Sequence, residues 1–285
     1  MEDGMGLRIN TNVPSLVAQR NLRGNRVLLD RTLERLSSGS RINHAGDDAA
    51  GLAISETLRA QIRGLGQAER NAQDGISLIQ VAEGGLVEIS NILIRMRELG
   101  VQAASDTVGV RERKFLDTEF QQLGEEIDRI SNSIEFNGNP LLNGNGSAFE
   151  VQIGTKNNPL VDRIKLFDPY ASNVNLVSLG LNLATVSDKT SAQNCLSSID
   201  QALNSATSIR AEFGAMQNRL QSVINNLNVN KENLTAANSR IRDADLAEET
   251  SELTKAQILN QAGVSVLSQA NSSVKSVLGL LGGQS

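Results

Sequence analysis

A long repeat of small and aliphatic residues constrains the fold of this chain more than any other feature. Eleven such residues follow one another in alternating steps of four and three: Ala68, Ala72, Gly75, Ile79, Ala82, Leu86, Ile89, Leu93, Met96, Gly100 and Ala103. This spacing is typical of a coiled-coil helix, in which the repeated residues form an apolar seam. At a rise of 1.5 Å per residue, the repeat predicts a helical rod about 50 Å long.

The same spacing recurs in other parts of the chain. Residues 116–134 and 216–244 carry it, so we expect three long helices to pack as a bundle. Near the chain ends, a C-terminal seam runs from Leu253 to Leu281, and a shorter N-terminal seam comprises Leu22, Leu29, Leu33 and Leu36. Asn230 and Asn260 occupy seam positions, where polar residues commonly fix the register of the helices.

The composition indicates that the two chain ends pack together. Aromatic residues make up 2% of the chain, and all of them lie between Phe115 and Phe213. Both ends must therefore build their cores from aliphatic side chains. The middle of the chain has a different pattern: residues 149–153 and 164–166 alternate between apolar and polar, which predicts a short β-hairpin, and residues 137–147 are rich in Gly and Asn, which predicts a loop.

The predicted fold is therefore mainly α: a long antiparallel helical hairpin or coiled-coil bundle formed by both chain ends, with a small β-hairpin near residues 140–180. No linker divides the chain into consecutive domains.

Composition also excludes several classes of function. The net charge is −5, which is unfavourable for binding nucleic acid. The single Cys195 and single His44 exclude a disulfide framework and an HExxH zinc site. No run of eighteen apolar residues predicts a membrane span, and the N-terminus lacks the pattern of a cleaved signal peptide. We expect no catalytic residue, metal site or cofactor.

One segment, residues 37–51, could be interpreted in two ways. His44, Asp47 and Asp48 lie close together, as in a metal or acid–base site. The alternative is structural and fits better: Gly39 ends one helix, and an aspartate before residue 49 caps the next. Gly51 and its small neighbours would allow another backbone to approach closely.

The N-terminal segment is basic. Seven arginines and two acids lie between Arg8 and Arg41, a composition shared with transit peptides and membrane-surface helices. The apolar seam at the C-terminus argues against an appendage of this kind, because that seam needs a partner helix and the N-terminal helix can supply it.

Motifs in both halves of the chain resemble those of bacterial flagellins. The first half carries LRINTN from Leu7, RTLERLSSGSRIN from Arg31, DDAAGLAISE from Asp47, RMRELGVQ from Arg95 and FNG from Phe136. The second half carries AMQNRL from Ala215, SRIRDADLAEE from Ser239 and the matching stretch from Gln257 to Asn271. Two features depart from the family pattern: residues 1–4 precede the usual start, which suggests initiation at Met5, and Cys195 is unusual.

The resemblance implies a structural protein that is exported unfolded by the flagellar type III apparatus and polymerises outside the cell into a helical propeller filament. It implies an inner terminal domain of residues 1–46 and 245–285 and a core helical domain of residues 47–244. Its implied partners are further copies of itself, an export chaperone, and the cap and junction proteins. The alternatives are the hook–filament junction protein of the same superfamily and a rod-like coiled coil unrelated to flagella.

The resemblance also implies a contact face. Toll-like receptor 5 recognises many flagellins through residues that correspond by motif to Arg95, Leu99 and Glu119. Arg95 and Leu99 are neighbours on one helix face and lie off the apolar seam, so we expect all three residues to be exposed for a receptor or a neighbouring subunit.

Overall fold

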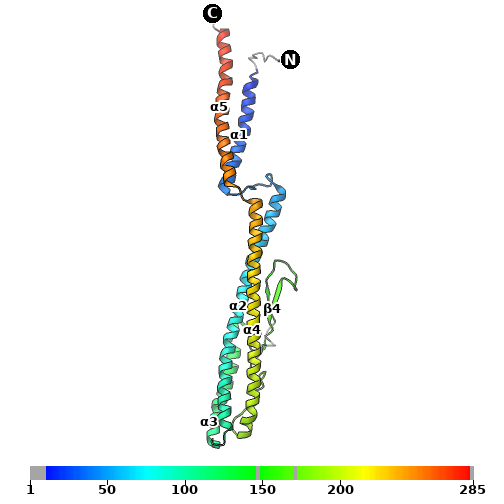
Figure 1. Cartoon of the computed structure of the whole chain (residues 1–285), viewed down its shortest axis with the longest axis vertical. Coiled ribbons are helices and arrows are strands. Elements are labelled where there is room, and N and C mark those ends of the chain that lie inside the picture. Colours follow the sequence, from blue (N-terminus) through cyan, green and yellow to red (C-terminus); the bar gives the residue numbers. More distant parts are fainter. Residues whose placement is uncertain (1–10, 146–147, 170–171, 283–285) are drawn as a thin grey trace. The chain divides into compact units, whose positions relative to one another are not determined.

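The computed structural model describes residues 11–145, 148–169 and 172–282, and most of them are helical (Figure 1). The helices are α1 (Val13–Ser38), α2 (Ala49–Ala104), α3 (Val110–Ser133), α4 (Lys189–Arg242) and α5 (Leu246–Gly282). The strands are β1 (Glu135–Phe136), β2 (Asn139–Pro140), β3 (Phe149–Gln152) and β4 (Arg163–Phe167). The mainly α fold with a small β-hairpin in the middle of the chain is confirmed.

The chain forms two compact units. The terminal unit comprises residues 1–59 and 234–285, and the central unit comprises residues 60–233. The divisions fall inside α2 and α4, so each of these helices contributes to both units.

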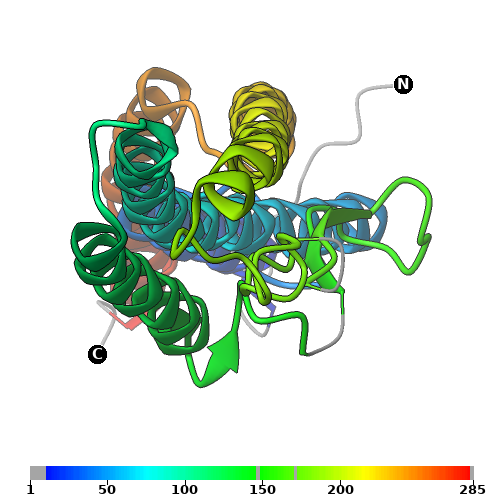
Figure 2. The same ribbon diagram turned by 90° about the horizontal axis from the view of Figure 1, so that it is seen from below.

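The apolar seam of α2 forms the core of the central unit. All eleven seam residues are buried, which confirms the heptad interpretation. They pack with apolar residues of α3 and α4, among them Phe120, Ile127 and Phe213, and the three helices lie together when viewed end-on (Figure 2). Gly100 lets α4 approach closely, because a Cβ atom there would lie 3.0 Å from a methyl carbon of Leu196. By length and composition α2 could also cross a membrane, but a buried bundle helix has the same properties.

Two short β-hairpins complete the central unit. β3 and β4 pair antiparallel with Val151 opposite Ile164, as the alternating pattern predicted. β1 and β2 form a second hairpin, which corrects the expectation that residues 137–147 are all loop. Its turn consists of Asn137 and Gly138, both with positive φ (52° and 76°). This Asn-Gly pair is a strong local signal for a tight hairpin.

The terminal unit is built on α1 and α5, which lie side by side (Figure 1). This confirms that the two chain ends pack together. The close approach depends on Gly263, where a Cβ atom would lie 3.0 Å from Cγ of Leu22. One predicted seam residue is wrong: Leu33 is 45% exposed, and Thr32 is buried in its place. The hydroxyl of Thr32 donates to the carbonyl of Leu28, which offsets the cost of burying a polar group.

The two seam asparagines differ in their surroundings. Asn230 is exposed, and its amide donates to Asn226 on the same helix at 2.8 Å. Asn230 therefore lies outside the buried part of the seam, and its role as a register device stays a prediction. Asn260 is half-buried, and its role as a register device stays a prediction.

Candidate assembly site

The loop between α1 and α2 is held by caps at both ends. Gly39 ends α1 in the left-handed conformation (φ 67°), as predicted. Asp48 is the N-cap of α2: its Oδ1 accepts from the backbone N–H of Gly51 at 2.8 Å. The two predicted cap functions thus belong to Gly39 and Asp48.

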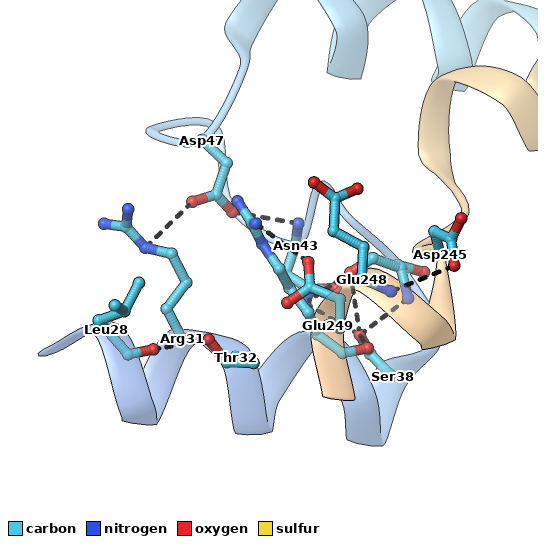
Figure 3. Close-up of polar contacts among 11 residues, drawn as sticks. Leu28, Arg31, Thr32, Ser38, Asn43, Asp47, Asp245, Glu248 and Glu249 are labelled. Atoms are coloured by element: carbon cyan, nitrogen blue, oxygen red, sulfur yellow. Dashed lines mark hydrogen bonds and ion pairs between the residues drawn. The ribbon is translucent and has the colours of Figure 1, made fainter. Parts of the chain in front are cut away.

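Asp47 stabilises the loop itself. Its Oδ2 accepts from the backbone N–H groups of Asn43 (3.2 Å) and His44 (3.1 Å), and Oδ1 lies 3.9 Å from Nε of Arg31 (Figure 3). These backbone donors, first that of His44, hold the pKa of Asp47 below its ordinary value. The carboxylate therefore stays charged and keeps the loop closed.

A second connection, between α4 and α5, pairs with this loop. The backbone N–H of Arg41 donates to the carbonyl of Arg242 at 2.6 Å, and that of Ala244 donates to the carbonyl of Gly39 at 3.0 Å. Ser40 and Asp243 form the antiparallel bridge between them. The two loops thus act as one backbone-bonded element, which we call the paired connection.

An ion pair between α1 and α5 lies beside the paired connection. Nη1 of Arg35 is 3.2 Å from Oε1 of Glu249, and Glu249 is only 8% exposed. The first turn of α5 is capped by Asp245, which accepts from the backbone N–H of Ala247 at 2.8 Å. Removal of either charge of the pair would leave the other partly buried without a partner, which is costly.

Gly51 is not free for a second backbone. It is buried, and a Cβ atom there would lie 2.9 Å from Cδ1 of Ile42 and 2.8 Å from Cγ of Asp48. Ile42 is itself 1% exposed. The space above Gly51 is therefore filled by its own loop, which corrects the expectation that this position receives another backbone.

The predicted contact face lies in the central unit and is only partly exposed. Arg95 donates from Nη2 (2.7 Å) and Nε (3.0 Å) to Oε1 of Glu119 on α3, and from Nη1 to Glu98 at 2.9 Å. These acceptors, first Glu119, raise the pKa of Arg95. Leu99 is different: it is 1% exposed and belongs to the core. The expectation that it is exposed is wrong, because α2 buries a second row of side chains beside the seam.

The terminal unit exposes apolar side chains on both of its helices. Large aliphatic side chains on the outward faces of α1 and α5 are at least 40% exposed: Val13, Leu16, Val17, Val27, Ile258, Leu259, Val264 and Val266. Two helices that pack as a pair bury only one side of each, so apolar residues elsewhere on α1 and α5 stay exposed. Exposed apolar surface of this kind marks an interaction site.

The described residues contain no group of three His, Cys, Asp or Glu side chains that could hold a metal ion. His44 is exposed and lies 3.2 Å from Glu34 through Nδ1.

Comparisons with known proteins agree with this architecture. The bacterial flagellin N-terminal helical region matches residues 9–147, and the bacterial flagellin C-terminal helical region matches residues 196–281. A flagellin of Halalkalibacterium halodurans is 47% identical over 273 residues, which cover 96% of this chain and 99% of that protein. The flagellar filament 33 kDa core protein of Treponema phagedenis is 41% identical over 284 residues, again with 96% and 99% covered.

A solved structure of a putative flagellar hook-associated protein from Vibrio parahaemolyticus superposes with a TM-score of 0.56. It covers 69% of this chain and 100% of its own, at 15% identity, and so supports the fold alone. The two matched helical regions and the relatives that align over almost their whole length establish that this chain belongs to the bacterial flagellin family.

Proposed function

We propose that this chain is the repeating structural subunit of an extracellular bacterial flagellar filament. The observation that carries the proposal is the exposed apolar surface of α1 and α5. A helix pair with bulky aliphatic side chains on its outer faces loses free energy when neighbouring copies cover them, at about 25 cal/mol per Å² of apolar area. In a helical assembly of identical subunits, each copy would provide that cover for the next.

In this proposal the inner terminal domain, residues 1–46 and 245–285, forms the wall around the filament channel. The core helical domain, residues 47–244, surrounds it. The paired connection lies where these two parts of the chain meet in sequence, and its backbone hydrogen bonds would transmit force between them without relying on exposed side chains.

The role is structural and involves no catalysis. The hook–filament junction protein is the alternative within the superfamily. Relatives that match 96% of this chain are named flagellins and filament core proteins, which favours the filament subunit. The junction protein would need to bind two different structures rather than extend a uniform polymer.

Export and capping add partners to the proposal. The chain would pass through the flagellar type III apparatus with an export chaperone and be added beneath cap proteins, next to junction proteins. For host Toll-like receptor 5, we propose the exposed Arg95–Glu119 pair as the contact, with Leu99 supporting it from the core. A receptor-reporter assay of Arg95→Glu against Val101→Glu, an exposed site on the same helix, tests this; equal signals contradict it.

Electron microscopy and sedimentation of purified protein test the filament proposal. Seeded with sonicated fragments of its own filaments, the chain should form tubes of uniform diameter above a critical concentration. Ile258→Glu, at a side chain 60% exposed on α5, should raise that concentration at least tenfold. Leu160→Glu, which is 93% exposed on the loop between β3 and β4, is the matched control. Protein that stays monomeric or forms irregular aggregates would contradict the proposal.

A further inference from the structure

Charge is distributed unevenly along the terminal unit. Residues 5–29 and 253–285 contain six Lys or Arg and no Asp or Glu. The first acid of α1 is Asp30, and Glu34 follows one turn later. The part of α1 near the N-terminus is therefore basic, whereas the part near the paired connection carries acids.

The outward face of α1 repeats this polarity in two rows with seven-residue spacing. Residues seven apart lie on the same side of a helix in a coiled coil. The first row reads apolar, basic, apolar and acidic: Val13, Arg20, Val27 and Glu34. The second reads apolar, basic and acidic: Leu16, Arg23 and Asp30. Val13, Leu16 and Val27 are 51%, 57% and 59% exposed, so the residues that the structure describes leave this face open.

The acidic end of the first row opens into a hollow of about 410 Å³ between α1 and the loop that follows it. Val27, Asp30, Glu34 and Asp47 line it together with Arg31, His44 and Gly46. The side chain of Glu34 is 43% exposed there. Because the lining has three carboxylates and one arginine, the hollow favours a cation.

The arginines at the basic end of the face differ from those farther along the helix. Within the described parts of the chain, Arg20, Arg23 and Arg26 are exposed and make no ion pair within 4 Å. In contrast, Arg31 and Arg35, farther along the same helix, are both paired with acids. The helix therefore carries unpaired cations and an acid-lined hollow on one continuous face.

We propose that this face of α1 packs against α1 of a second copy, parallel and offset by two heptads. At 1.5 Å per residue the offset is about 21 Å along the helix. In the first row it places Arg20 of one copy at Glu34 of the next and Val13 at Val27, so that charge meets opposite charge and apolar meets apolar; in the second row it places Leu16 at Asp30. The inference rests on the proposed filament function, because subunits related by one screw axis share their polarity.

Other offsets match the first row less well. With no offset, Arg20 faces Arg20 across the contact, which is repulsive. With one heptad, Val13 faces Arg20 and Val27 faces Glu34, so both apolar side chains of the first row lie against charges. Only the two-heptad offset aligns both kinds of residue in the first row, and the charges would then select the axial stagger of the copies.

Charge reversal tests the pairing. In seeded polymerisation at low salt, Arg20→Glu and Glu34→Arg should each raise the critical concentration at least tenfold. The double variant should return to within threefold of wild type, since it restores the pair with the charges exchanged. Arg26→Glu, the same change on the flank of α1, is the control and should stay near wild type. Added salt should reduce the differences.

Cross-linking tests the stagger independently. Val13→Cys combined with Val27→Cys should give a ladder of disulfide-linked chains in filaments, whereas Val13→Cys alone should give none. Wild-type protein that does not polymerise contradicts the filament function itself. Filaments that form with unchanged critical concentration in Arg20→Glu, or a ladder from Val13→Cys alone, contradict only the proposed contact.

Discussion

Leu99 provides a direct test of where the core of the central unit ends. Its side chain is 1% exposed and packs with the buried residues of α2, α3 and α4. A contact residue in the same motif would instead be accessible, and its truncation would affect binding while leaving the subunit stable. The two interpretations therefore predict different effects on the free energy of unfolding.

We expect Leu99→Ala to lower the free energy of unfolding by about 3 kcal/mol. A buried Leu→Ala change costs about 2–5 kcal/mol, which combines the lost transfer free energy of the side chain with the cavity that remains. With a urea m-value of about 2 kcal/mol/M, the unfolding midpoint should fall by about 1.5 M. Urea titration of the full chain, followed by circular dichroism, measures this shift.

Two control variants on the same helix separate burial from position. Val101→Ala removes two methyl groups from a side chain that is 51% exposed, and should change stability by less than about 0.5 kcal/mol. Arg95→Ala removes an exposed ion pair and should cost about 1 kcal/mol or less. If Leu99→Ala shifts the midpoint no more than Val101→Ala, then Leu99 is not part of the core and the reasoning fails.

Three further predictions concern the terminal unit and the lone cysteine. Asp48→Ala should destabilise the start of α2 by about 1 kcal/mol through loss of the N-cap, which urea titration measures. Gly51→Leu should displace both the cap and the loop and prevent polymerisation, which sedimentation measures. Normal filaments from Gly51→Leu would refute the tight packing around Gly51. Burial, and then the charge of Asp117, raises the pKa of Cys195 to about 11, above its value in the unfolded chain. The free energy of unfolding should therefore be constant below about pH 8 and fall as the pH rises from about 9 through 11. Iodoacetamide should modify Cys195 slowly in folded protein and rapidly in urea, and equal rates would show that the thiol is accessible. Limited proteolysis should trim residues 11–46 and 245–282 in monomer and spare them in filaments, because a two-helix pair buries little surface; equal protection in both states would contradict this.

The pairing of the chain ends and the core of the central unit could be read from local pattern. A heptad repeat specifies both the helix and its buried face, because apolar residues that recur every 3.5 positions on average lie along one side of a helix and are buried there. This is why the residues from Ala68 to Ala103 could be named as core in advance. The cap functions of Gly39 and Asp48 could also be predicted from the sequence, because helix caps depend on residue type and on neighbours a few positions away.

Only the tertiary structure decided which residues beside each seam are buried. Leu99 lies off the heptad row of α2 but is buried, because three helices surround a wider arc than two. Leu33 follows the N-terminal pattern but is exposed, because α1 has one partner and Thr32 occupies the facing position. The small residues around Gly51 were recognised, but only the folded loop determines that Ile42 and Asp48 fill the space above it. Sequence periodicity thus determined which helices form and which face is apolar, whereas the number of neighbouring elements determined which flanking side chains are removed from water.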